Sequence, residues 1–131
     1  MGRRFGKNIA RRLIQKFENY RLPDGLSEGD ICSIESGSGG FGIVKILALE
    51  PGTVHIRLYK EKFATRPDCI DATGLSLGTI HGGDGFGIGH LPLSARNFAQ
   101  WEPMIIGHEE VSPEELEGYN YWKESGGGVW G

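Results

Sequence analysis

Residues 75–94 read LSLGTIHGGDGFGIGHLPLS, and residues 31–50 read ICSIESGSGGFGIVKILALE. Each stretch has two apolar segments separated by a glycine-rich turn, and each places Gly-Phe-Gly-Ile at the start of its second segment, at residues 40–43 and 85–88. Short apolar segments on either side of a glycine-rich turn are typical of β-hairpins. The sequence therefore predicts two hairpins that together frame a small β domain.

The apolar pattern also predicts individual strands. Residues 41–50 are apolar at both odd and even positions, so both faces of a strand here would be apolar. This indicates a central strand that is covered on both faces. Residues 54–59 alternate most clearly, with aliphatic side chains on one face and the side chains of His55, Arg57 and Tyr59 on the other. The remaining predicted strands are residues 31–36, 75–80, 86–91 and 104–107. An irregular connection is expected at residues 60–74, where Arg66-Pro67-Asp68 disfavours a strand.

Three helices are expected around these strands. Residues 3–22 place apolar side chains every three or four positions, as in an amphipathic helix. Ser94 is a suitable cap for a short helix that continues to Gln100. Ser112, Pro113 and Glu115 form the sequence pattern of a capping box at the start of a last helix, residues 112–125. We expect Trp130, beyond this helix, to fold back as an anchor or to remain exposed as a contact.

The expected fold class is therefore α+β. We predict a bent antiparallel sheet of five or six strands, or a partly open small β-barrel, with an N-terminal and a C-terminal helix. At 131 residues the chain is predicted to form a single domain, with a basic helix at residues 1–22, a β core at 29–107 and the last helix at 112–125.

Composition narrows the class of protein. No apolar run approaches the length of a membrane span, and the first residues do not resemble a secretory signal, so we expect a cytoplasmic protein. The two cysteines, Cys32 and Cys69, do not form a CxxC motif and are expected to be reduced thiols. No cofactor is predicted.

Charge is distributed unevenly along the chain. Residues 1–22 contain 7 Lys or Arg and 1 acidic residue, a net charge of +6, whereas residues 23–131 contain 7 Lys or Arg and 16 acidic residues, a net charge of −9. The first helix is open to three interpretations: a cap on the β core, a surface for nucleic acid or anionic lipid, or an organellar targeting segment. The cations concerned are Arg4, Lys7, Arg11 and Arg12.

His81, Asp84 and His90 lie within the second predicted hairpin. If Gly83 and Asp84 form its turn, the two histidines lie about 13 Å apart along the sheet, because a strand advances roughly 3.3 Å per residue. A zinc ion binds its ligands at about 2 Å, so this spacing disfavours a shared metal. We expect hydrogen-bonded histidines beside a turn aspartate, or a polar binding contact.

A second cluster of basic and aromatic side chains is predicted on the outer face of the third strand and on the connection that follows. Its members are His55, Arg57, Tyr59, Lys60, Lys62 and Arg66. Two interpretations are open: an ordinary solvated strand face, or a binding face for an anionic or peptide partner.

Residues 29–47, with Gly29-Asp30-Ile31, Ile34 and then Gly39-Gly40-Phe41-Gly42-Ile43-Val44, resemble the first hairpin of a bacterial immunity-protein family. The resemblance implies a small β-barrel that neutralises a cognate toxin. It carries no functional residue over to this chain, and it does not extend to the basic helix or the second hairpin.

Three functional hypotheses follow. The first is a non-catalytic module that binds a protein partner, such as an immunity or accessory protein, because no catalytic constellation stands out and the body of the chain is acidic. The second is a binder of nucleic acid or an anionic surface through the basic helix. The third is an enzyme that uses His81, Asp84 or His90. No catalytic residue is assigned, and the sequence does not predict the oligomeric state.

Overall fold

The computed structural model describes residues 20–78 and 87–129. It contains strands β1 (Asp30–Glu35), β2 (Phe41–Glu50), β3 (Thr53–Phe63), β4 (Ile88–Ser94) and β5 (Met104–His108). The helices are α2 (Ala95–Ala99), α3 (Glu117–Glu124) and the 3₁₀ turns η1 (Ala72–Gly74) and η2 (Glu114–Leu116). The α+β class predicted from the sequence is confirmed.

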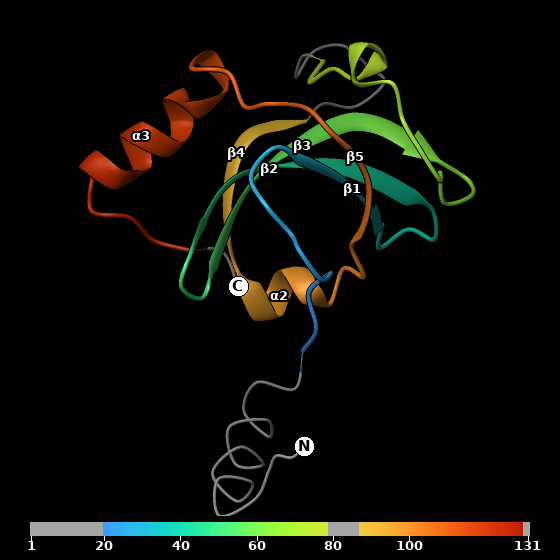
Figure 1. The fold of residues 1–131 in the computed structure, drawn as a ribbon, viewed down its shortest axis with the longest axis horizontal. Coiled ribbons are helices and arrows are strands. Elements are labelled where there is room, and N and C mark those ends of the chain that lie inside the picture. Colours follow the sequence, from blue (N-terminus) through green and yellow to red (C-terminus); the bar gives the residue numbers. More distant parts are fainter. Residues whose placement is uncertain (1–19, 79–86, 130–131) are drawn as a thin grey trace, which may run out of the picture.

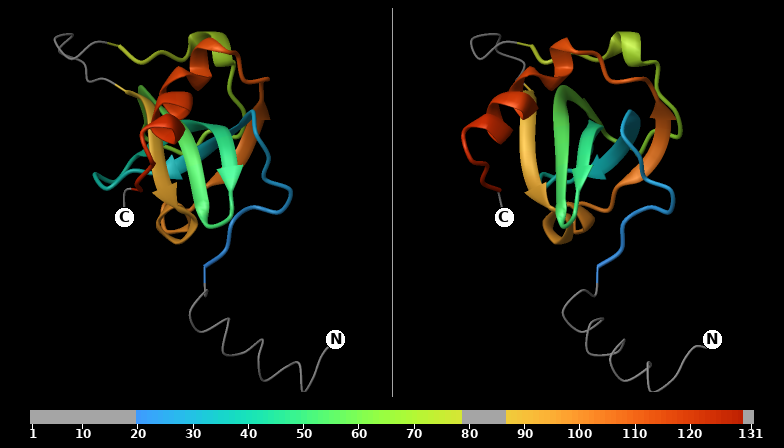
Figure 2. Two further views of the ribbon diagram at one scale, coloured as in Figure 1. Left: turned by 90° about the vertical axis from the view of Figure 1, so that its left-hand side faces the viewer. Right: turned by 60° about the vertical axis from the view of Figure 1, so that its left-hand side comes forward.

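The strands form one antiparallel sheet in the order β4-β3-β2-β1-β5. The sheet is open, since β4 and β5 occupy its two edges and do not pair with each other. Figure 1 shows that the sheet curves, and Figure 2 shows α3 and residues 20–29 on opposite sides of it.

The first predicted hairpin is confirmed. β1 pairs with β2 from Ile31 opposite Lys45 to Glu35 opposite Phe41. The turn that joins β2 to β3 has Gly52 at φ 76°, in the left-handed region that glycine adopts without strain. β2 is the central strand of the sheet, and its residues from Gly42 to Ala48 are buried on both faces, as its sequence predicts.

The sheet separates two apolar clusters. The inner core lies against α2 and residues 20–26, and it includes Val44, Ile46, Ile56 and Phe98. The outer core, on the other face, is smaller: Ile31, Ile43 and Tyr59 lie under Ile70, Leu75 and Leu77 and their neighbours. The connection between β3 and β4 therefore covers one face of the sheet.

The second predicted hairpin is partly wrong. Residues 75–78 form no strand beyond a single bridge at Gly78, and the neighbour of β4 in the sheet is β3. One backbone hydrogen bond, from Gly87 N to Leu77 O at 2.6 Å, joins the two halves of the expected hairpin. Its glycine-rich turn lies outside the described residues.

β4 pairs with the first half of β3 instead. Val54 lies opposite Leu93 and Ile56 opposite Leu91, and all four side chains enter the inner core. β3 also continues to Phe63, where it pairs with β2, so residues 60–63, predicted as part of an irregular connection, are strand.

Three other local predictions are confirmed. Ser94 caps α2 by accepting a hydrogen bond from Asn97 N at 3.0 Å. Ser112 and Glu115 form a reciprocal capping box, with bonds of 2.8 Å and 3.2 Å. β5 matches the predicted strand at 104–107 with one further residue.

Both cysteines are free, Cys32 buried and Cys69 exposed.

The predicted first helix lies mostly outside the described residues, as does Trp130. Residues 20–22 are described and are not helical. Tyr20 and Leu22 pack against the inner core, so the segment that leads into β1 does contribute to the apolar interior.

Candidate functional site

Two residues that the sequence assigns to different clusters, His55 and His90, meet beneath α3. His55 lies on β3 opposite Pro92 of β4, and His90 is two residues away on the same face of β4. The Nδ1 atom of His55 lies 2.9 Å from Nε2 of His90. His81 and Asp84, the partners considered for His90 in the sequence, lie outside the described residues.

Glu50 and Tyr119 complete a chain of hydrogen bonds through this pair. The Oε1 atom of Glu50 lies 3.1 Å from Nε2 of His55, and the Tyr119 hydroxyl donates to Oε2 of Glu50 at 2.8 Å. Both ring nitrogens of His55 are therefore occupied, and its side chain is fully buried. Glu50 ends β2, so the chain links three strands of the sheet to the last helix.

Aromatic rings of α3 cover the two histidines. Trp122 meets the His55 ring edge-on with centroids 4.4 Å apart, and Tyr119 does the same at 4.6 Å. The backbone of α3 also comes very close to β4, because a Cβ atom at Gly118 would lie 2.7 Å from Cβ of His90. We call Glu50, His55, His90, Tyr119 and Trp122 the histidine cluster.

The electrostatics of the cluster favour a neutral His90 and an ionised Glu50. Burial, together with the charge that His55 can carry, lowers the pKa of His90 to about 4. Hydrogen bonds from Tyr119 and His55 lower the pKa of Glu50. Burial and the hydrogen bond to Glu50 raise the pKa of Tyr119 to about 12.

An ionised Glu50 defines the direction of one of these hydrogen bonds, because its carboxylate accepts from Nε2–H of His55. Between the two rings, a neutral His55 accepts at Nδ1 from Nε2–H of His90, and a protonated His55 donates from Nδ1 to Nε2 of His90. The cluster is thus a line of donors and acceptors along which a proton can be held or passed. Among residues 20–78 and 87–129, no group of three or more His, Cys, Asp or Glu side chains is arranged to hold a metal ion.

A buried lysine on the same face of the sheet is missed by the sequence analysis. Lys45 is fully buried, and its ammonium group donates to Glu109 at 3.0 Å, to Glu115 at 3.1 Å and to the backbone oxygen of Glu110 at 3.0 Å. Hydrogen bonds from Ser112 and Lys45 lower the pKa of Glu115 against the opposing effect of its partial burial. The network attaches the start of η2 to the centre of the sheet.

The second predicted cluster does not lie on a single solvated face, contrary to expectation. His55 and Tyr59 are buried, and burial raises the pKa of Tyr59 to about 12. Arg66 lies elsewhere: it donates to Oγ of Ser33 at 2.8 Å and stacks 4.9 Å from the centroid of Phe41. Arg57 is half-buried. Whether these residues contact a partner stays a prediction.

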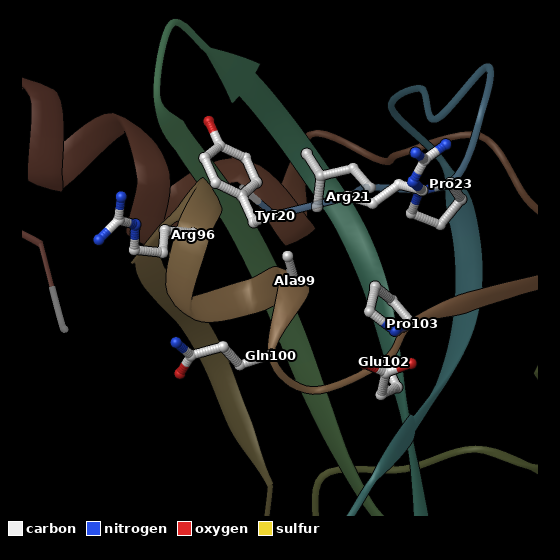
Figure 3. A pocket seen from close by; sticks show the side chains of 9 residues that line it. Tyr20, Arg21, Pro23, Arg96, Ala99, Gln100, Glu102 and Pro103 are labelled. Atoms are coloured by element: carbon white, nitrogen blue, oxygen red, sulfur yellow. The ribbon is translucent and has the colours of Figure 1, made fainter. Parts of the chain in front are cut away.

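The most exposed apolar part of the sheet is its β5 edge. Met104 is 54 % exposed and Ile105 is 39 % exposed. β5 has β1 as its one neighbour in the described sheet. Just before β5, Glu102 and Pro103 line a cavity of about 530 Å³. Figure 3 shows Tyr20 and Ala99 at this cavity, with Arg21 and Arg96 at opposite sides of it. We call Glu102, Pro103, Met104 and Ile105 the edge surface.

The predicted basic side chains Arg4, Lys7, Arg11 and Arg12 lie outside the described residues. Among the residues that are described, no helix is long and apolar enough to cross a membrane.

No protein-family model matches the chain, and no significant match was found among curated proteins or solved structures. The fold and the two sites define a small α+β protein with an open, curved sheet of five antiparallel strands. On one face of this sheet, α3 covers the histidine cluster and is attached by hydrogen bonds and ring contacts. The β5 edge of the sheet exposes apolar side chains.

Proposed function

We propose that the protein is a non-catalytic binding module that engages an extended, positively charged segment of a protein partner at its edge surface. An edge strand presents unpaired backbone groups, to which a peptide can add as a further strand. The observation that carries the proposal is β5 itself: an edge strand with the sequence MIIGH and two exposed apolar side chains.

The two edges of the sheet differ in a way that favours β5. Natural edge strands are protected against pairing by proline, by charge or by a covering element. β4 has Pro92 in its middle and α3 packed beside it. β5 contains no proline, lysine or acidic residue, so it lacks these protections within its own length.

Charge around β5 favours a basic partner. Residues 102–124 contain 7 acidic residues and 1 lysine, a net charge of −6. Within the described part of the chain, two of the seven, Glu109 and Glu115, form ion pairs, both with Lys45. The others, which form none, are exposed at Glu102, Glu110, Glu114, Glu117 and Glu124. A partner segment that carries lysine or arginine would meet a complementary field, which increases association rates.

The resemblance of residues 29–47 to an immunity-protein family fits this proposal. An acidic module that covers a basic surface of another protein is the form that such neutralising or accessory proteins take. In the same proposal, the curved sheet is a partly open barrel whose open side is the β5 edge, where the partner strand adds.

The test places a photo-crosslinking amino acid at position 105 of the full chain and, as a matched control, at position 121. Tyr121 is also an exposed apolar residue, 73 % exposed, but lies on α3. In extract of the native cells, crosslinks to one defined protein are expected from position 105 alone. Crosslinks from position 121 alone, or none from position 105, would contradict the proposal.

Binding to the purified partner then tests the chemistry. Ile105→Lys should weaken binding by about tenfold or more, because it adds a cation where a basic strand docks, whereas Tyr121→Lys should change it less than about twofold. The affinity should also fall as salt rises, since salt screens exposed charges. Equal losses in both variants would contradict docking at the edge surface.

A second candidate function is suggested by the net charge of +6 in residues 1–22. We propose that these cations bind nucleic acid or an anionic lipid surface. Replacing Arg4, Lys7, Arg11 and Arg12 together by Gln should abolish salt-sensitive binding to DNA, RNA or anionic vesicles. An absence of such binding by the native chain at low salt would eliminate this candidate.

A further inference from the structure

We propose that the histidine cluster is a pH-operated clasp that holds α3 against the sheet at neutral pH and releases it on mild acidification. The released helix uncovers the face of β3 and β4 on which His55 and His90 lie. This inference concerns the opposite side of the sheet from residues 20–29, and it does not depend on the partner proposed above.

The attachment of α3 makes it suitable for release. None of its residues is fully buried, so the helix is not held by a deep apolar contact. The Lys45 network holds η2, just before α3, and Gly118 approaches His90 closely. Beyond these, α3 is attached by the Tyr119 hydroxyl on Glu50 and by the edge-on contact of Trp122 with His55. Both depend on the position of one buried imidazole, which is itself held between Glu50 and His90.

The hydrogen-bond chain tolerates few protonation states. With both histidines neutral, every nitrogen between Glu50 and His90 faces a partner of the opposite kind. When both imidazoles are protonated, two N–H groups face each other at 2.9 Å and two positive charges lie side by side, so this state requires the rings to separate.

A first added proton fits the closed chain when His55 carries it, because Nε2–H then donates to Glu50 and Nδ1–H donates to His90. A second proton is unfavourable while the helix is closed, because it creates a charge on His90 in a partly buried position, beside that cation and the Tyr119 and Trp122 rings. The groups that face the cluster are Glu50 from β2, His55 from β3, and Tyr119 and Lys123 from α3. Lys123 is a further cation, and Glu50 is already engaged by both His55 and Tyr119. The negative charge of Glu28 also contributes to the raised pKa of Tyr119.

The pH range follows from the titration of His90. With α3 closed its pKa is about 4, compared with an ordinary value of 6.5 when the ring is free in water. A depressed histidine pKa stabilises the closed state above 6.5, and this stabilisation is lost as pH falls from 6.5 towards 4. The full difference corresponds to a factor of about 300 in the closed-to-open ratio, and because His90 is partly exposed we expect at least about tenfold.

The test measures hydrogen-exchange protection of individual backbone amides in the full chain between pH 7.5 and 5, corrected for intrinsic exchange rates. We expect the amides of residues 119–124 to lose at least about tenfold in protection over this range, while those of β2 stay unchanged. Constant protection of α3, or loss of protection by α3 and β2 together, would overturn the proposal.

Two histidine variants separate the clasp from general acid effects. His90→Gln keeps a polar side chain that does not titrate, so α3 should lose its pH dependence while keeping or lowering its protection. His108→Gln is the matched control: His108 is paired with Asp30 at 2.9 Å and, within the described residues, forms no hydrogen bond with the histidine cluster, so its loss should leave the pH dependence of α3 intact. The reverse pattern would overturn the proposal.

A second readout covers the case in which His90→Gln weakens folding. In the native chain, the ring nitrogens of His90 should give nuclear magnetic resonance shifts of a hydrogen-bonded neutral tautomer at pH 7.5. His90 should titrate together with the change in α3 protection. Titration of His90 near 6.5 with α3 still protected would show that the helix does not sense its charge, and would overturn the proposal.

Discussion

Gly118 shows how closely α3 approaches the sheet. The Cβ atom of any other residue at this position would lie 2.7 Å from Cβ of His90, closer than two carbon atoms can approach without movement. Glycine in a helix costs about 1 kcal/mol relative to alanine. Gly118 therefore destabilises α3 itself but allows its backbone to contact β4.

We therefore predict that Gly118→Ala destabilises the protein despite its better helix propensity. The clash should outweigh the propensity gain and leave a net loss of about 1–2 kcal/mol in the free energy of unfolding, measured by urea denaturation. Gly37→Ala is the control, because nothing lies within 4 Å of its Cβ position and its φ is not in the left-handed region. A more stable Gly118→Ala protein would show that α3 does not pack closely against β4.

Lys45 illustrates the cost of a buried charge. Its ammonium group lies at the centre of the sheet with acceptors on three residues, and Glu115, one of them, is 15 % exposed. Removing one partner from a largely buried ion pair leaves the other charge without compensation, which is usually more costly than removing both.

We predict that Lys45→Met lowers the free energy of unfolding by about 3 kcal/mol, although methionine fills most of the same space. The double variant Lys45→Met, Glu115→Gln should recover part of this loss, because it also removes the uncompensated carboxylate. Urea denaturation of the two proteins and the parent measures both effects. A double variant that is less stable than Lys45→Met alone would contradict this explanation.

At the scale of elements, a side-chain hydrogen bond to the backbone sets where a helix begins. Ser94 ends β4 and caps α2 within one residue, so the chain turns from strand to helix without a loop. α2 places Phe98 in the inner core and so closes one end of the sheet.

We predict that Ser94→Ala costs about 1 kcal/mol of stability, the usual effect of losing a serine cap. Ser38→Ala, in the exposed β1–β2 turn, should change stability by less than about 0.5 kcal/mol. Thermal or urea unfolding of both variants measures the difference. A cost at position 94 no larger than at position 38 would mean that α2 does not depend on its cap.

The elements that the sequence predicts correctly are those with local signals. β2 has apolar residues on both faces, Ser94 and Ser112 have cap patterns, and Pro51-Gly52 has turn chemistry. The strand predicted at 75–80 lacked such a local signal, since its glycine-rich turn is compatible with a hairpin whether or not the strands pair. Its outcome depended on the pairing of β4 with residues 53–58 of β3, a contact across the sheet that no local signal at residues 75–80 reveals.

The histidine cluster shows why the sites were harder to predict than the fold. Alternation along residues 54–59 correctly places His55 and Tyr59 on one face, but it does not reveal that this face is covered. The cover comes from α3 and residues 70–77, which are distant in sequence. Two signals indicated a second buried face: residues 41–50 are apolar on both faces, and the last helix carries the aromatic residues Tyr119 and Trp122.

At the scale of the whole molecule, the groups with a lowered pKa all reduce stability as the solution is acidified. Hydrogen bonds lower the pKa of Glu50 and of Glu115, so each stabilises the fold above its ordinary pKa near 4.5 and loses this effect as pH falls through its folded value. His90 adds a loss that begins at a higher pH, between 6.5 and about 4.

We therefore predict two stages of acid destabilisation. Between pH 7 and 5 the urea midpoint should fall modestly through His90, and below about pH 4.5 it should fall more steeply as the carboxylates are protonated. His90→Gln should flatten the first stage and leave the second. A midpoint that rises between pH 7 and 5 would contradict a lowered pKa of His90 in the folded protein.

The pairing of β1 with β5 has a consequence for how the chain is made. Ser33 lies opposite Met104, about 70 residues later, so β1 has no outer neighbour until that length has been synthesised. Ribosomes add roughly 5–20 residues per second, whereas a hairpin forms in microseconds, so β1 waits several seconds with one side unpaired. A nascent chain that stalls before residue 104 would expose the strand DICSIE to its neighbours on the polysome, and its survival would depend on chaperones.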